Sequence, residues 1–365
     1  MLIKINKSPD NKLFEAYKKH DLEKFKELIR QGENVNCISD DKSLIFSVIM
    51  NWEQVPSDLN KQFFDALIEA GVHLGQIGDE PRLLSACLVA QNTTYHYMKT
   101  LLDNKINTDL KKERICDNYE RNIEPLIFDF IWTKNWENLR LLLKYKPNLN
   151  VYDSSKEPVL NSLIDKISSN ESDLIKLFIA GGANVNNIST GGITALHKLC
   201  ETLEDTHNID VLLKAGADIN AADSRTKYTA LHRAVSAGLV GNMKHLIKMG
   251  ADVNKKDSLG NPASFLAVSK SNPDALEILS NSDIDLSHTT DWGHNVCHHI
   301  CTKSKEYFDE NPKDAKKFID FMKNHLELLS AKDGFDRTPL QYLQSRLPKE
   351  TSKLIKLVNN SQKTL

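Results

Sequence analysis

The sequence lacks long apolar runs, an excess of charge of either sign and any dense cluster of cysteines. No stretch approaches the ~18 consecutive apolar residues of a membrane-spanning helix. Basic and acidic residues number 47 and 49, and no block of like charge is long enough to follow a phosphate backbone. We therefore expect no membrane span and no nucleic-acid partner.

The N-terminal segment also lacks the apolar core of a secretory signal peptide. The six cysteines are spread thinly over 365 residues, unlike those of small disulfide-rich secreted domains: Cys37, Cys87, Cys116, Cys200, Cys297 and Cys301. We expect reduced thiols and a cytoplasmic, monomeric protein. Phosphate-loop, zinc-protease and nucleophile-elbow motifs are absent too, so the sequence predicts no cofactor and no catalytic residue.

What the sequence does have is an internal repeat. The nine residues that begin at Phe178 recur, with conservative changes, at Leu212 and at Leu246, each copy 34 residues after the one before. Their last residues read Gly-Ala-Asn-Val-Asn, Gly-Ala-Asp-Ile-Asn and Gly-Ala-Asp-Val-Asn. A second motif, Thr-Ala-Leu-His, begins at Thr194 and Thr229. Self-similarity at such a period indicates stacked structural repeats.

Together these motifs resemble the ankyrin repeat, whose period is about 33 residues and whose signature is Thr-Pro-Leu-His followed by Leu-Leu-x-x-Gly-Ala-Asp-Val-Asn. The resemblance implies an all-α solenoid of about ten stacked helix pairs with short β-hairpin fingers. The first apolar residue of the nine-residue motif can be followed along the whole chain: Leu28, Leu67, Leu101, Leu142, Phe178, Leu212, Leu246, Leu279, Phe321 and Leu354.

The quality of the match to the repeat divides the chain into three parts. These are a divergent N-terminal part with insertions, a well-matched part, and a divergent C-terminal part with a cap, at residues 1–156, 157–300 and 301–365. Three spacings exceed the period and place insertions near residues 51–60, 108–123 and 303–316. Insertions in repeat proteins lie in loops on one face, and that face is often functional.

Individual motif positions have physical roles. Thr194, Thr229 and Thr338 each precede an apolar helical stripe, so their hydroxyl groups can cap an otherwise unpaired backbone N–H. Gly216 and Gly250 follow the apolar run of a second helix, where a left-handed residue ends the helix.

One cluster of residues could carry chemistry: His294, Cys297, His298, His299 and Cys301 are close enough in sequence to ligate zinc or to pair a nucleophile with a base. The repeat register instead places Cys297 and Cys301 on the buried helix face, which favours a structural role. The resemblance implies that His197, His232 and His298 bridge neighbouring backbone groups.

The resemblance further implies that fingers and first helices form a concave surface that binds another protein. Trp292 is a large aromatic residue at a finger tip, which is typical of an interface hot spot, although it could instead pack on the adjacent finger. Lys198 and Ser269 fall on the first helices. The candidate partner-binding residues are Arg225, Lys227, Tyr228, Arg233, Ser236, Leu259, Asp291, Trp292, His299 and Phe335.

Asn220 and Asn254 resemble ankyrin-repeat asparagines that a eukaryotic asparaginyl hydroxylase modifies. Their alternative role is to bond to the backbone of their own turn.

The sequence therefore favours a protein-interaction module. The Lys/Asn/Ile-rich composition is similar to that of ankyrin-repeat effectors which intracellular bacteria secrete into the host cytosol. Two alternatives remain: an enzyme whose site lies in the poorly matching residues 42–122 or in the insertions, and an assembly scaffold.

Overall fold

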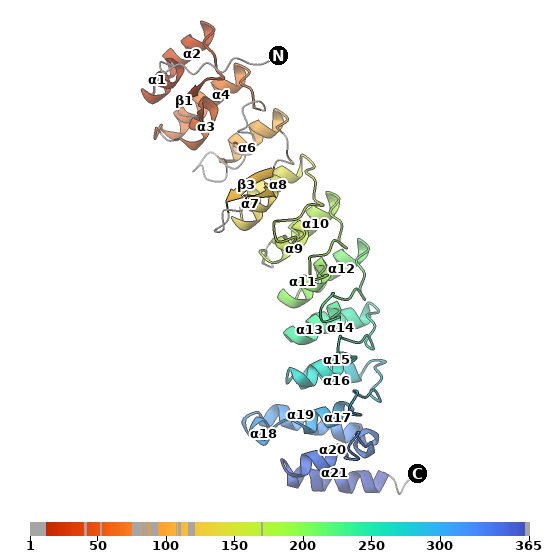
Figure 1. Cartoon of the computed structure of the whole chain (residues 1–365). Coiled ribbons are helices and arrows are strands. Elements are labelled where there is room, and N and C mark those ends of the chain that lie inside the picture. The colour runs from red at the N-terminus through yellow and green to blue at the C-terminus, as the bar shows by residue number, and fades with distance from the viewer. Residues whose placement is uncertain are drawn as a thin grey trace. The chain divides into compact units, whose positions relative to one another are not determined.

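The computed structural model describes residues 12–39, 42–51, 53–74, 83, 87, 94–106, 108, 111–115, 121–168 and 171–361. The protein is rich in helices, which follow one another in pairs (Figure 1). It divides into two compact units: residues 1–167 with 173–184, and residues 168–172 with 185–365. No helix among the described residues is long and apolar enough to cross a membrane.

The first unit contains two short antiparallel hairpins among its helices. Strand β1 (Ile38–Ser39) pairs with β2 (Lys42–Ser43), and β3 (Lys111–Ile115) pairs with β4 (Arg121–Pro125). Its helices are α1 (Lys12–Lys18), α2 (Leu22–Arg30), α3 (Leu44–Met50), α4 (Ser57–Glu69), α6 (Thr94–Asp103), α7 (Ile127–Trp132), α8 (Trp136–Leu143), α9 (Val159–Ile164) and α10 (Asp173–Ala180).

The second unit has helices joined by turns and loops, with no strand among its described residues. Its helices are α11 (Ala195–Thr202), α12 (Thr206–Lys214), α13 (Ala230–Ala237), α14 (Val240–Lys248), α15 (Ala263–Ser269), α16 (Pro273–Ser280), α17 (Val296–Cys301), α18 (Lys305–Glu310), α19 (Pro312–Asn324), η2 (Leu326–Ser330), α20 (Pro339–Gln344) and α21 (Pro348–Ser361). First helices pack on first helices, α11 on α13, α13 on α15 and α15 on α17, and second helices pack likewise.

Helix ends in the second unit follow the sequence motifs. Thr194, Thr229 and Thr338 open α11, α13 and α20 with reciprocal capping boxes, as expected for a hydroxyl group at that position. Gly216 and Gly250 have φ values of 88° and 90°, in the left-handed region that only glycine enters freely. The repeat motif thus specifies where each helix begins and ends.

The core is built between neighbouring repeats. Leu212, Leu246 and Leu279 are fully buried at the equivalent position of three second helices. Cys297 and Cys301 are also fully buried, on the face of α17 that the register assigns to the core. Since one helix pair cannot cover its own apolar face, each repeat depends on the next for burial.

The asparagine that ends each well-matched motif joins successive loops. The Asn220 side-chain oxygen accepts the backbone N–H of Asp252 in the next repeat at 2.9 Å. Asn254 likewise accepts from Asp285 and donates to the carbonyl of Asp283. The expectation that these side chains bond to their own turn is therefore wrong, since in each case it is Asp218 or Asp252 that bonds within the turn.

Two of the predicted insertions contain added structure. The β3–β4 hairpin occupies the second insertion, and helix α18 lies within the third, between α17 and α19. The number of repeats stays a prediction, because most of the helix expected before α6 lies outside the described residues. The division of the chain at residues 156 and 300 also stays a prediction.

Candidate protein-binding surface

Tight turns precede the first helices of the second unit, and we call them the fingers. In each finger the backbone N–H of the first residue donates a hydrogen bond across the turn. Asp223 N donates to Tyr228 O at 3.0 Å, and Asp257 N donates to Asn261 O at 2.9 Å. No strand is assigned to them, so within the described residues they are turns rather than the expected β-hairpins. The fingers are residues 189–193, 223–228, 257–261, 290–294 and 333–337.

Backbone hydrogen bonds also join the fingers to one another. Ser224 N donates to Gly191 O, Ser258 N to Thr226 O, and Gly334 N to Trp292 O, each at 2.8 Å. A Cβ atom on Gly293 would lie 2.9 Å from Gly334 N, so the last two fingers approach too closely for a side chain there. These bonds join the first three fingers to one another and the last two to each other, and we call the row of five fingers the finger ridge.

The tips of the ridge expose large apolar side chains. Leu259, Trp292 and Phe335 occupy equivalent positions in three fingers and are 76%, 65% and 57% exposed. Trp292 stacks on Phe335 with ring centroids 6.0 Å apart and an interplanar angle of 11°. Trp292 therefore packs on the adjacent finger and still presents most of its surface to solvent, and its role as an interface hot spot stays a prediction.

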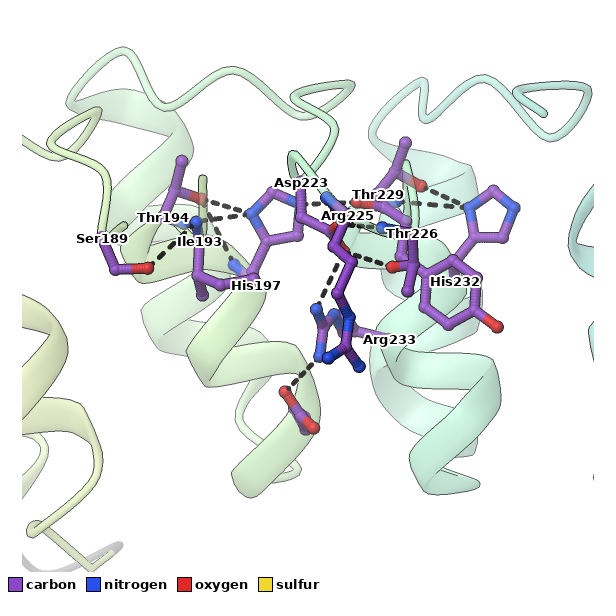
Figure 2. A network of polar contacts seen from close by, with 12 residues as sticks. Ser189, Ile193, Thr194, His197, Asp223, Arg225, Thr226, Thr229, His232 and Arg233 are labelled. Carbon is purple, nitrogen blue, oxygen red and sulfur yellow. Dashed lines mark hydrogen bonds and ion pairs between the residues drawn. The ribbon is translucent and has the colours of Figure 1, made fainter. Parts of the chain in front are cut away.

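A buried carboxylate holds the second finger in place. Asp223 is 1% exposed and accepts hydrogen bonds from Arg225 N, from Thr226 N and Oγ1, and from Arg233 Nη2 (Figure 2). Burial raises the pKa of this carboxyl group, but the bonds from Thr226 and Arg233 outweigh burial and hold the pKa at about 2. Arg233 also pairs with Glu201 at 3.0 Å, which ties the finger to helices α13 and α11.

The motif histidines bridge neighbouring repeats, as the resemblance implies. His197 interacts through Nδ1 with its own cap Thr194 and through Nε2 with the Tyr228 carbonyl at 2.9 Å (Figure 2). His298 bonds in the same way to Asn295 and to Arg337 O. Burial lowers the pKa of both imidazoles, so they stay neutral at pH 7.

The third motif histidine, His232, lacks the hydrogen bond to the next repeat. His232 makes the same contact with its cap Thr229, but its Nε2 lies near the backbone of Asn261 outside the geometry of a hydrogen bond. Burial lowers its pKa to about 4.

A second buried carboxylate organises the last finger. Asp333 is buried and accepts hydrogen bonds from Phe335 N, Arg337 N and the Tyr342 hydroxyl. Burial raises the pKa of Asp333, but these bonds and the Arg337 guanidinium outweigh it and hold the pKa well below its usual range. His294 Nε2 lies 3.1 Å from the same carboxylate. Phe335 is thus presented by a fixed turn.

Polar groups lie along the first helices beside the ridge. Ser269 and His299 share a hydrogen bond of 2.9 Å between α15 and α17. Lys303 donates to Ser271 at 2.8 Å and lies 4.4 Å from the centre of the Tyr307 ring, on the inserted helix α18. Burial lowers the pKa of His299 and of Lys303. The inserted helix therefore lies near the C-terminal ends of α15 and α17, whereas the fingers precede the N-terminal ends of these helices.

The candidate partner-binding residues all lie on the fingers or first helices of the second unit, but their surroundings differ. Exposed members are Arg225, Lys227, Leu259, Asp291, Trp292 and Phe335. Partly buried members are Tyr228, which stacks on His232, and Arg233, Ser236 and His299. The engagement of Arg233 by two carboxylates gives it a role in holding the finger.

The two buried aspartates were missed by reasoning from the sequence. A signal was available, because an aspartate, serine or threonine opens every finger: Ser189, Asp223, Asp257, Thr290 and Asp333. Each of these side chains accepts a backbone N–H later in its own turn. Short polar side chains that bond two to four residues ahead are typical of tight turns.

Cys297 and Cys301, considered as metal ligands or nucleophiles, are buried, and burial suits neither role. Burial raises the pKa of the Cys297 and Cys301 thiols, which disfavours the thiolate needed for nucleophilic attack or metal binding. In the part of the chain that the structure describes, no group of three or more His, Cys, Asp or Glu could hold a metal ion. Much of the region 42–122, proposed for a hidden enzyme site, lies outside the described residues.

Stacked helix pairs with a finger between successive pairs are the arrangement of a repeat protein. Residues 163–257 match the family model of ankyrin repeats in three copies. Among solved structures, the ankyrin repeat domain of Bcl-3, described as a unique member of the IkappaB protein family, is similar with a TM-score of 0.51 and 17% identity. That match covers 63% of this chain and 97% of the Bcl-3 chain. No curated protein matches the chain.

These similarities establish an ankyrin-like fold and ankyrin repeats in the middle of the chain. Ankyrin repeats are in general protein-interaction modules, and the fold is typically non-enzymatic.

Proposed function

We propose that this protein binds another protein through the finger ridge and the adjoining first helices of its second unit. The observation that carries the proposal is the row of exposed apolar tips at Leu259, Trp292 and Phe335. Large apolar side chains that are aligned and exposed characterise interaction sites, whereas isolated ones need no explanation.

The rigidity of the ridge supports the same proposal. Each turn is closed internally, backbone hydrogen bonds join the first three turns to one another and the last two to each other, and Asp223 and Asp333 fix two of the turns. A preorganised surface loses little conformational entropy when it binds, so more of the contact energy is available as affinity.

The test is affinity capture from eukaryotic cell lysate with the wild type beside a Trp292→Ala, Arg225→Ala variant, read by mass spectrometry. Loss of a specific protein in the variant is the expected result. Lys244→Ala, Lys248→Ala is the matched control, because both lysines are exposed on α14, a second helix away from the fingers. A protein that is captured equally by all three chains would contradict binding through the ridge.

We propose further that the partner is a host-cell protein and that the chain acts as a secreted effector in the host cytosol. The support is the similarity of its composition to ankyrin-repeat effectors of intracellular bacteria. A translocation reporter fused to the chain, expressed in a bacterium with and without a functional secretion system, tests this. A signal in host cells that does not depend on secretion would contradict it.

Asn220 and Asn254 are proposed hydroxylation sites in such a cytosol. Each is also a bridge to the next loop, so the modified atom lies beside a structural hydrogen bond. Peptide mass spectrometry of the chain recovered from eukaryotic cells should show the mass of one added oxygen on either residue. Unmodified peptides in the presence of active hydroxylase would end the proposal.

A further inference from the structure

The finger ridge carries two different chemistries along its length. Its tips from Leu259 to Phe335 are apolar, whereas the preceding segments expose four cations: Arg225, Lys227, Lys255 and Lys256. None of these four forms an ion pair with a described residue. Cations are therefore exposed at one end of the ridge and large apolar groups at the other.

Lys256 lies close enough to Asp285 to lower the pKa of that carboxyl group, but two other acidic groups near the basic end are engaged by different donors. Asp223 is buried and paired with Arg233, and the Asp257 carboxylate accepts the N–H groups of Leu259 and Asn261. At the apolar end Asp336 pairs with Lys332, and the Arg337 guanidinium lies between the rings of Phe335 and Tyr342. Arg225, Lys227 and Lys255, all before residue 257, thus make no ion pair with a described residue.

The spacing of the apolar tips fits an extended chain. The ring centres of Trp292 and Phe335 are 6.0 Å apart. Alternate side chains of an extended strand recur every ~6.7 Å and point to the same side. An extended segment can therefore place two alternate apolar side chains against Trp292 and Phe335.

We propose that the ridge binds an extended partner segment that is acidic at one end and carries alternating apolar residues at the other. The acidic end lies on Arg225, Lys227, Lys255 and Lys256, and the apolar end on Leu259, Trp292 and Phe335. This inference rests on the proposed function and specifies the chemistry of its partner. The bipartite charge pattern also fixes the direction in which the segment lies along the ridge.

Synthetic peptides test this chemistry directly by fluorescence anisotropy. The probes are a labelled peptide with a run of glutamates followed by leucine, tryptophan and phenylalanine at alternating positions, the same two blocks in the opposite order, and a scrambled peptide with acidic and apolar residues interspersed. One of the two block peptides should bind at least about tenfold more tightly than the scrambled one.

Variants of the full chain separate the two ends. Arg225→Glu, Lys227→Glu should weaken binding of the preferred peptide about tenfold and flatten its dependence on salt, because screened charge attraction is lost. Trp292→Ala, Phe335→Ala should weaken it about tenfold or more and leave the salt dependence in place. Lys244→Glu, Lys248→Glu is the charge-matched control and should change affinity by less than about twofold.

Equal binding of block and scrambled peptides, or unchanged affinity in either ridge variant, would overturn the inference. The proposed function fails separately, when affinity capture yields no protein that depends on Trp292. A protein captured through Trp292 together with failure of every peptide would reject the acidic–apolar chemistry and leave the binding function standing.

Discussion

At the scale of single residues, buried polar groups decide how the fingers are held. Asp223 receives four hydrogen bonds while nearly inaccessible to water, so its charge depends on those donors. Removing one partner of a buried charged network leaves the other unsatisfied. The contribution of Asp223 to stability can therefore be measured against an exposed aspartate of the same ridge.

Asp223→Asn should lower the free energy of unfolding of the second unit by about 2 kcal/mol, because charge-assisted bonds are lost and Arg233 keeps only Glu201. Hydrogen exchange of amides in α13 would report the change. Asp291→Asn is the control, because Asp291 is exposed on a neighbouring finger. If both substitutions cost the same, Asp223 would not hold the finger.

The same carboxylate predicts a dependence on pH. Its folded pKa of about 2 lies below the unfolded value of about 3.9, so its contribution is complete above pH ~4 and is lost as the pH falls towards 2. The difference in stability between wild type and Asp223→Asn should therefore shrink over that range. A constant difference down to pH ~2 would contradict the assignment.

His197 and His232 should differ in how much each contributes to the free energy of unfolding. Gln341 occupies the motif position in α20 and completes the same capping box, so glutamine is a conservative replacement. His197→Gln should cost about 1 kcal/mol because it loses the bond to Tyr228 O, and His232→Gln should cost less because no such bond is well formed. Hydrogen exchange in α11 and α13 measures both, and the reverse order would contradict the bridging role.

His232 also predicts a loss of stability in mild acid. Its folded pKa of about 4 lies below the unfolded value of about 6.5, so the unfolded chain takes up a proton first and stability falls as the pH drops from 6.5 to 4. His232→Gln should flatten that part of the stability profile, measured by urea unfolding at a series of pH values. An unchanged slope would show that the imidazole is already protonated in the folded chain.

At the scale of helices, the repeat motif predicts most of what the structure contains. Capping by Thr194 and helix termination at Gly216 are local effects of a few residues, so they could be predicted from the sequence. Packing of Trp292 on the adjacent finger was one of two alternatives that the sequence left open, but its partner Phe335 could not be predicted, because the two residues are far apart in the sequence and the third insertion lies between them. The buried network around Asp333 depends in the same way on residues from two repeats.

The dependence of each helix pair on the next predicts the effect of a core substitution. Leu246 in α14 is fully buried, so Leu246→Ala should cost about 2 to 5 kcal/mol. Lys248→Ala in the last turn of the same helix should cost less than about 0.5 kcal/mol, because Lys248 is exposed. Hydrogen exchange should show the loss of protection in α14 and in its neighbours α12 and α16. Loss confined to α14 would contradict coupling between repeats.

At the scale of the molecule, function was harder to predict than fold. The motifs identify ankyrin-like repeats because they encode caps, turns and core positions, whereas the residues exposed on the ridge are free to differ from one repeat to the next. Trp292 was singled out because a large apolar side chain at a turn has no core to fill. The buried carboxylates beneath the ridge were missed, although a short polar residue opens every finger in the sequence.

The most direct test of binding through the ridge is photo-crosslinking in eukaryotic cell lysate. A photoreactive amino acid would replace Leu259, which is 76% exposed at a finger tip, and in a second chain would replace Lys248 on α14. We predict a specific crosslinked protein with the probe at position 259 and none at position 248. The same crosslink at both positions, or a crosslink at position 248 alone, would contradict the account.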